Sequence, residues 1–350
     1  MTIPRQRRGI FIRLCLTWQI NKLKDKSMKL THRARKFTFL RLIVILTVLA
    51  GLSAEAGEKA KKLKVEEGMK AINGTELYYK SIGEGTPIVI LHGGPGLDHS
   101  YFLPQMAQLA RHYRLIFFDQ RVSGRSSNVV DTSAITMSDF VEDVEGIRKA
   151  FKLKKVNLFG HSWGGLVAMF YAIKYPDNLN SLMLVNSTPA SAGWRSASFV
   201  LMGRRTSPED SIAQANLVQT EGFRKRLPKA MSDFFRILFR GTFYNRTYAD
   251  SLTLSLDTSF TTKSRLMQYL NKDTTLLNYD VFRKLSVVHC PTLIISSTYD
   301  MVAPEANERL QQSIPASTHV VLDSCGHFPF VEAPRRFFSV MEGFLKKAVR

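Results

Sequence analysis

The sequence has little cysteine, and we expect it to form no disulfide. Only three cysteines occur in 350 residues, and Cys15 lies in the N-terminal leader. Cys290 opens an expected strand at 292–296, whereas Cys325 follows the end of the next expected strand at 319–322. In a parallel sheet these are opposite strand ends, separated by about 17 Å against a Cα limit of ~7 Å for a disulfide. Cys290 and Cys325 should therefore be free thiols.

The sequence also has no internal repeat and no low-complexity tract, and its one linker-like stretch is the lysine-rich segment 58–64. Hydrophobic residues make up 45% of the chain, which is ordinary for a globular protein and excludes a disordered or fibrous one. We expect one enlarged domain after the leader.

Acidic residues are scarce relative to basic ones, and the formal net charge is +20. Such basicity raises the question of nucleic acid or an anionic membrane surface as a partner. Residues 1–56 hold twelve Lys or Arg against Asp25 and Glu55, a net of +10, so the other 294 residues carry only the remaining +10. Half of the basicity belongs to this leader, and we expect no nucleic-acid partner.

The leader has the layout of a secretory signal, with basic residues ahead of an apolar run at 42–52 and Ala54–Ala56 as a cleavage site. Its eleven apolar residues are fewer than the ~20 that span a bilayer as a helix. We expect cleavage after Ala56 and export to the periplasm or beyond. The alternative is an uncleaved leader that anchors the protein in the membrane. Met28 lies at a natural distance before the signal, so translation starts there or at Met1.

Short apolar runs separated by helical stretches predict an α/β fold. The expected strands are 77–81, 87–91, 114–118, 156–159, 181–185, 292–296 and 319–322. Helical stretches are expected at 137–151 and 165–175. Continuous apolar runs of this kind are typical of strands buried on both faces, so the sheet should be mostly parallel and doubly covered.

The pattern changes between residues 189 and 280, where apolar residues recur at helical spacing. We expect a helical cap here, inserted between core parts 57–188 and 281–350. Nine of its residues form a basic series: Arg195, Arg204, Arg205, Arg224, Lys225, Arg226, Lys229, Arg236 and Arg240. A solvated helical face explains this series most simply, and a preference for anionic substrates is the alternative.

Residues 160–164 read Gly-His-Ser-Trp-Gly and stand between an expected strand and an expected helix. A serine at such a turn has a strained backbone, so its neighbours must be small. The amides at the start of the helix point at the site, where they stabilise developing negative charge. This junction predicts Ser162 as a nucleophile rather than a structural serine.

A serine hydroxyl needs a base that takes its proton. His327 follows the last expected strand, in a loop that Gly326 allows to turn tightly, and we expect it to be that base. The competing histidines are less well placed, because His289 precedes a strand and His319 lies within one.

An acid must hold the imidazole in place, and Asp300 follows the strand before the one that leads to His327. Asp323 is the rival, only four residues from the histidine. The chain order Ser, Asp, His with the acid one strand earlier favours Asp300.

Residues 92–96, His-Gly-Gly-Pro-Gly, end another expected strand. The glycines let the backbone approach a reacting carbonyl, so we expect the amides of Gly94 and Trp163 to form an oxyanion hole. A phosphate-binding loop is the alternative, but no Gly-Lys-Ser/Thr follows.

Together with Asp119–Arg121 and Gly124–Ser126, these motifs resemble the proline iminopeptidase branch of the α/β-hydrolases. The resemblance covers nearly everything from about residue 70 onward. It implies an α/β-hydrolase fold with a cap that covers the site and selects substrate, and it implies no cofactor and no metal.

Two features depart from that family. Val122 stands where the family usually has glycine, so the loop 119–126 is expected to differ in shape. Similar iminopeptidases hold the substrate's amino group with acidic side chains, whereas this insertion is basic. Its early acids, Glu209, Asp210 and Glu221, match none of the family's amine-binding positions.

The sequence therefore predicts a serine hydrolase that works through an acyl-enzyme. Release of N-terminal proline or another small residue from peptides is the first hypothesis, and hydrolysis of a small ester, lactone or amide is the alternative. A hydrolase fold kept as a binding protein without turnover is a hypothesis of another class. The expected partner is a small molecule or short peptide, with membrane contact only through an uncleaved leader.

Overall fold

A central sheet organises the protein. The computed structural model describes residues 63–103 and 105–348, so the predictions for the leader lie outside the described residues. Within this part an eight-stranded sheet has the order β1-β2-β4-β3-β5-β6-β7-β8. The strands are β1 Val65–Ile72, β2 Thr75–Ile82, β3 Thr86–Leu91, β4 Tyr113–Phe118, β5 Val156–His161, β6 Leu179–Val185, β7 Thr292–Ser297 and β8 Ser317–Leu322.

Strands β3 to β8 pair in parallel with one another. Strand β2 pairs antiparallel with both of its neighbours, β1 and β4. The predicted mostly parallel sheet is confirmed. The sequence did not indicate β1, because its residues alternate between exposed and half-buried positions and form no apolar run.

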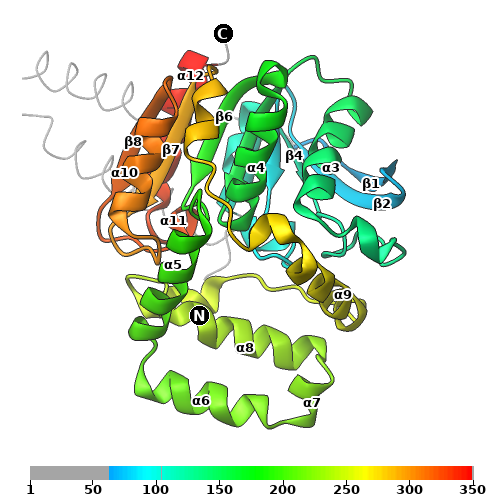
Figure 1. Ribbon diagram of the computed structural model, residues 1–350, viewed down its shortest axis with the longest axis vertical. Coiled ribbons are helices and arrows are strands. Elements are labelled where there is room, and N and C mark those ends of the chain that lie inside the picture. Colours follow the sequence, from blue (N-terminus) through cyan, green and yellow to red (C-terminus); the bar gives the residue numbers. More distant parts are fainter. Residues whose placement is uncertain (1–62, 104, 349–350) are drawn as a thin grey trace, which may run out of the picture. The chain divides into compact units, whose positions relative to one another are not determined.

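Helices cover both faces of the sheet (Figure 1). One apolar core packs α3 Met137–Ala150, α4 Trp163–Lys174 and α10 Pro304–Ser313 against one face. A second core packs α12 Pro334–Ala348 against the other face, together with α11 Pro329–Glu332. Alternate residues of each central strand enter opposite cores, which explains why these strands are apolar throughout.

Short 3₁₀ helices complete the connections. They are η2 His99–Phe102, η3 Gln105–Arg111, η4 Thr132–Ala134, η5 Pro176–Asn178, η6 Arg246–Ser251, η7 Met267–Lys272, η8 Thr274–Leu276 and η9 Arg283–Val287. None of the helices in the described part of the chain is long and apolar enough to cross a membrane.

The segment 189–280, called the cap from here on, folds largely as helices that gather at one end of the sheet (Figure 1). Its α-helices are α5 Ala192–Arg205, α6 Pro208–Val218, α7 Glu221–Arg224, α8 Pro228–Arg240 and α9 Phe260–Leu266. The two ends of the cap pair with each other, because an isolated antiparallel bridge joins Ser191 to Asp280.

Side chains from the last third of the cap hold it against the core. Asp273 accepts a hydrogen bond from the backbone N–H of Met137 at 2.6 Å, which satisfies a free amide at the start of α3. The buried Lys263 donates through Nζ to the Gly124 carbonyl at 2.5 Å. The cap is therefore fixed to two separate segments of the core.

A buried ion pair joins the loop after β4 to α3. Arg121 is fully buried and donates through Nε and Nη2 to the two carboxylate oxygens of Asp143, at 2.7 and 2.6 Å. Asn73 donates to the same carboxylate at 3.2 Å. Such a pair offsets the cost of removing its charges from water only while both partners are present.

We predict that Arg121→Ala lowers the free energy of unfolding by about 3–5 kcal/mol, because it leaves the Asp143 carboxylate buried without a counter-charge. Lys149→Ala removes an exposed cation from α3, the helix that also carries Asp143, and should lower the free energy of unfolding by no more than ~0.5 kcal/mol. Urea denaturation measures both. Equal losses in the two variants would contradict the prediction.

Candidate active site

Ser162 occupies a strained turn between β5 and α4. Its backbone has φ 54° and ψ −121°, in a region that residues other than glycine rarely adopt. A Cβ on Gly160 would lie 2.5 Å from the Gly164 carbonyl oxygen, and one on Gly164 would lie 2.6 Å from the His92 oxygen. The turn is so tight that no side chain fits at either glycine, which leaves Ser162 as the side chain presented at its tip.

His327 and Asp300 lie together, as the sequence predicts. The Nδ1 atom of His327 is 2.7 Å from Oδ1 of Asp300, and both side chains are buried. Asp323 is exposed instead and accepts a hydrogen bond from Thr298 at 3.3 Å. The structure therefore places Asp300, and not Asp323, beside the histidine.

The two competing histidines lie elsewhere. His289 is exposed ahead of β7, at the opposite end of that strand from Asp300. His319 is within β8, and its Nε2 lies 2.7 Å from the Ser296 hydroxyl.

Ser162 and His327 line one cavity of about 120 Å³. Among the described residues, no hydrogen bond joins the Ser162 hydroxyl to the imidazole of His327. Such a bond often tightens only when substrate binds, so a shared cavity is the relevant geometry in the free protein.

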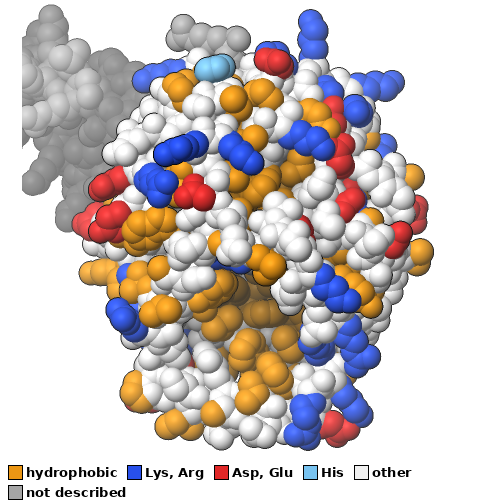
Figure 2. Space-filling model, in the orientation of Figure 1, with side chains coloured by type: hydrophobic (Ala, Val, Ile, Leu, Met, Phe, Trp, Pro, Cys, Tyr) orange, Lys and Arg blue, Asp and Glu red, His pale blue; other side chains and the backbone are white. Residues whose placement is uncertain are grey.

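The remaining wall of this cavity is mostly apolar. Besides Gly93, Gly94 and His161, it consists of Leu97, Tyr101, Phe199, Met202, Leu238, Phe239, Met301 and Phe328. No aspartate or glutamate is among the described residues that line it, and none of the nine basic residues of the cap series is either. On the face drawn in Figure 2, hydrophobic side chains likewise gather around a hollow at the level of the cap.

The amides of Gly94 and Trp163 are available as donors. Neither backbone N–H donates a hydrogen bond to another group in the described part of the chain. Trp163 is the first residue of α4, where the amide has no partner within the helix. Gly94 has φ 128°, which glycine adopts without strain.

A chain of buried hydrogen bonds joins the loop of Gly93 to the loop of His327. The Gly93 N–H donates to the Tyr101 hydroxyl at 2.6 Å, and that hydroxyl lies 2.8 Å from Nδ1 of His161. Nε2 of His161 lies 2.8 Å from the His327 carbonyl oxygen. Burial lowers the pKa of His161 well below its usual value, so the ring is neutral.

The partners of this neutral ring assign its proton. A carbonyl oxygen can only accept, so Nε2 of His161 carries the proton and donates to His327. Nδ1 then accepts from the Tyr101 hydroxyl. The sequence presented His161 only as the second residue of a motif, and nothing in the sequence pointed to Tyr101.

Gln120 ties the start of the glycine loop to the helix after Ser162. Its backbone N–H donates to His92 Nε2 at 3.0 Å, and its side chain donates to the His92 carbonyl at 2.7 Å. The Trp163 indole donates to Gln120 Oε1 at 3.0 Å. Both segments that carry the candidate oxyanion donors therefore share one buried amide.

Val122 adopts φ 50°, the left-handed conformation that glycine favours, although it is β-branched and buried. At this position the loop 119–126 therefore has a backbone conformation that suits glycine. Asp119 helps to hold the loop, because it is fully buried and accepts from the Arg125 N–H at 2.8 Å.

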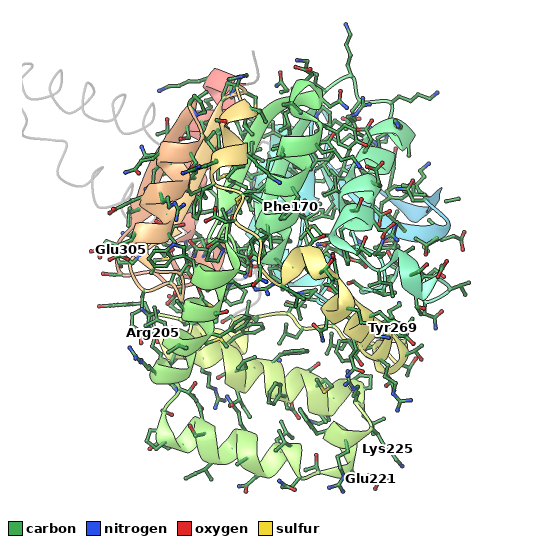
Figure 3. All side chains as sticks on the ribbon, viewed as in Figure 1. Phe170, Arg205, Glu221, Lys225, Tyr269 and Glu305 are labelled. Atoms are coloured by element: carbon green, nitrogen blue, oxygen red, sulfur yellow. The ribbon has the colours of Figure 1, made fainter. Side chains whose placement is uncertain are left out.

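None of the early acids of the cap lines the cavity. Asp210 is buried and accepts hydrogen bonds from Arg246 and, at 3.2 Å, from Arg240. Glu209 is exposed, and Glu221 pairs with a lysine one turn away at the outer edge of the cap (Figure 3). Asp210 and Glu221 thus have structural partners, and none of the three carboxylates is placed in the cavity to hold a substrate.

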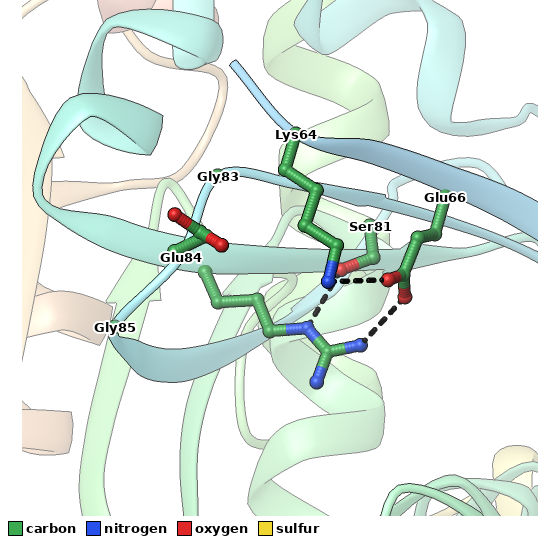
Figure 4. Close-up of a pocket in the computed structure, with 7 residues that line it drawn as sticks. Lys64, Glu66, Ser81, Gly83, Glu84 and Gly85 are labelled. Carbon is green, nitrogen blue, oxygen red and sulfur yellow. Dashed lines mark hydrogen bonds and ion pairs between the residues drawn. The ribbon is translucent and has the colours of Figure 1, made fainter. Parts of the chain in front are cut away.

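A second pocket, of about 230 Å³, lies beside β1 and β2 (Figure 4). Its cations already have partners: Lys64 and Arg114 pair with Glu66 at 2.9 and 3.2 Å, and Arg114 also donates to Ser81 at 2.8 Å. This pocket offers less to a ligand than the cavity at Ser162.

The predicted free thiols are confirmed for Cys290 and Cys325. Burial raises the pKa of Cys325 to about 12, so this thiol stays protonated. In the part of the chain that the structure describes, no three His, Cys, Asp or Glu side chains are grouped so that they could hold a metal ion.

Comparison with known proteins places the chain in a family. A family model for the alpha/beta hydrolase fold matches residues 86–334, which is more than half of the chain. The chain belongs to the α/β-hydrolase family. The predicted fold class is therefore confirmed, and the protein has a hydrolase fold.

Similar proteins also support the predicted branch. The proline iminopeptidase of Lactobacillus helveticus is 30% identical over 298 residues, which cover 81% of this chain and 98% of that protein. A solved proline iminopeptidase from Mycobacterium smegmatis has a TM-score of 0.59 and 22% identity, covering 81% of this chain and 98% of its own. An enol-lactonase from Burkholderia xenovorans LB400 has a TM-score of 0.57 and 25% identity, covering 80% and 100%. The resemblance to the proline iminopeptidase branch is confirmed.

We predict that Tyr101→Phe lowers the free energy of unfolding by about 1–3 kcal/mol, because the Gly93 amide and His161 each lose a buried partner. Tyr269→Phe is the matched control, since that ring is 38% exposed and its hydroxyl makes no hydrogen bond to a described residue. Chemical denaturation of both variants is the measurement. A Tyr101 variant as stable as the control would show that the chain of bonds is not formed.

Proposed function

We propose that the protein is a serine hydrolase in which Ser162 is the nucleophile, His327 the general base and Asp300 the acid that orients it. Three observations support these roles. The strained turn presents Ser162 at the end of β5, His327 lines the same cavity, and Oδ1 of Asp300 lies 2.7 Å from Nδ1 of the imidazole.

The reaction follows from this arrangement. His327 takes the proton of Ser162 as the oxygen attacks the substrate carbonyl, and the carboxylate of Asp300 stabilises the resulting imidazolium. The free amides of Gly94 and Trp163 stabilise the negative oxygen of the tetrahedral intermediate. The imidazolium then protonates the leaving group, and His327 activates the water that hydrolyses the acyl-enzyme.

The residues that line the cavity favour one class of substrate over the other. A substrate ammonium group in this cavity would meet apolar side chains such as Phe199, Met202 and Leu238, because no carboxylate is among the described residues that line it. Burying an unpaired charge is costly. A neutral substrate avoids that cost. The volume of about 120 Å³ is also below the roughly 300–1,000 Å³ of sites for drug-sized ligands. We therefore propose hydrolysis of a small, neutral ester or lactone.

Release of N-terminal proline from peptides is the second candidate. It is favoured by the 30% identity to the protein named proline iminopeptidase in Lactobacillus helveticus. It would require an acidic group that reaches the substrate's amine, and the early cap acids do not line the cavity.

We predict that Ser162→Ala abolishes labelling by a fluorophosphonate and lowers kcat by roughly 10⁴-fold or more, because the attacking oxygen is removed. Ser187→Ala is the matched control: this buried hydroxyl has no hydrogen-bond partner among the described residues, so its loss should leave labelling unchanged. A wild-type protein that is neither labelled nor active on any ester or peptide would support a binding protein instead.

The nitrophenyl esters of glycine and propionic acid test the substrate class, since they differ by an ammonium against a methyl group. After division by each ester's spontaneous rate of hydrolysis, we expect kcat/KM for the propionate to be at least about tenfold higher. A higher value for the glycine ester, together with turnover of proline nitroanilide, would establish the iminopeptidase.

A further inference from the structure

Arg205, the last residue of α5, reaches from the cap to the loop that carries Asp300 (Figure 3). Its Nη1 donates to the backbone carbonyls of Tyr299 and Asp300, at 2.6 and 2.8 Å. The guanidinium carbon lies 4.1 Å from the centroid of the Tyr299 ring, a cation–π contact. One cap side chain therefore holds two consecutive peptide groups of this loop.

The carboxylate of Asp300 has few partners of its own. Oδ1 accepts from the Met301 N–H at 2.7 Å and also lies 2.7 Å from His327 Nδ1. Oδ2 is buried and has no hydrogen-bond partner among the described residues. With only one of its oxygens held, the orientation of the carboxylate depends strongly on the position of its backbone.

The core supplies part of that position. The Asp300 N–H donates to the Ser297 carbonyl at 3.1 Å, and the Tyr299 N–H donates to the Cys325 carbonyl at 2.9 Å. Both bonds use the amides of the loop. Arg205 binds the two carbonyls, and it does so from outside the core.

Arg205 is itself anchored within the cap. Arg246 donates to the Arg205 carbonyl at 3.4 Å and to the Ser207 hydroxyl at 3.2 Å, and it pairs with the buried Asp210. The end of α5 is thus joined to a buried charged group. A shift of this helix relative to the core would be transmitted to Tyr299 and Asp300.

We propose that Arg205 is a positioning residue that couples the placement of the cap to the orientation of Asp300, and through Asp300 to His327. This inference rests on the proposed function of the site. The same helix contributes Phe199 and Met202 to the cavity wall. Helix α5 therefore links the contact of a substrate with the cavity wall to the alignment of Asp300.

The test compares Arg205→Ala, Arg205→Lys and Arg204→Ala. Arg204 is the matched control, because it is exposed, lies next in the same helix and carries the same charge. Two readouts are measured for each variant: the rate of fluorophosphonate labelling, and kcat and KM on nitrophenyl propionate. Thermal unfolding reports whether each variant is folded.

For Arg205→Ala we expect labelling and kcat to fall by about 10- to 100-fold, the scale of a displacement of about 1 Å in an active site, while KM changes less than about threefold. Lysine donates to one carbonyl but lacks the planar fork, so Arg205→Lys should recover part of the loss. Arg204→Ala should match the wild type.

Normal labelling and kcat in Arg205→Ala would overturn the role of Arg205, as would equal losses in Arg204→Ala. If Arg205→Ala does not fold, the lysine variant decides: a folded protein with reduced kcat supports the role, and wild-type kcat rejects it. A wild-type protein that is not labelled would overturn the proposed function, and this role with it.

Discussion

The conformation of Ser162 is the constraint around which the site is built. A backbone with φ 54° is strained for serine, and it persists because β5 is held between β3 and β6 in the middle of the sheet. The tightness of the turn brings α4 against the end of β3, where the His92 carbonyl lies 2.6 Å from the position a Gly164 side chain would occupy. The contact between α4 and the end of β3 therefore fixes the positions of both Ser162 and the glycine loop.

The core does not complete the site alone, because the cap backbone also supports the histidine loop. The His327 N–H donates to the Thr242 carbonyl at 2.8 Å. Glu332 accepts from the Gly326 N–H at 2.6 Å and from the Asn245 N–H at 2.8 Å, so one carboxylate joins this loop to the cap. Together with Arg205, these contacts make the cap a part of the framework that holds Asp300 and His327 as well as the wall of the cavity.

The charged side chains of the cap make structural contacts, within the cap or with the core, and do not line the cavity. Lys229 pairs with Asp233 at 2.7 Å on the outside of α8, and Asp210 pairs with two arginines. Helix α8 instead contributes Leu238 and Phe239 to the wall of the cavity that Ser162 also lines. A basic composition therefore coexists with an apolar cavity, and a preference for anionic substrates finds no support in the lining.

Much of the fold could be predicted from local sequence, since apolar runs and turn residues act over a few neighbours. These patterns placed strands β2 to β8, the turn at Ser162, and Asp300 and His327 at the carboxyl edge of the sheet. Other features exist only between distant segments, such as the contacts of His161 with His327 and of Arg205 with Asp300, which are 166 and 95 residues apart. The absence of acids from the described lining of the cavity is also a feature of this kind. Such features depend on how the cap helices rotate and pack against the sheet, and helical periodicity identifies an apolar face without specifying what that face meets.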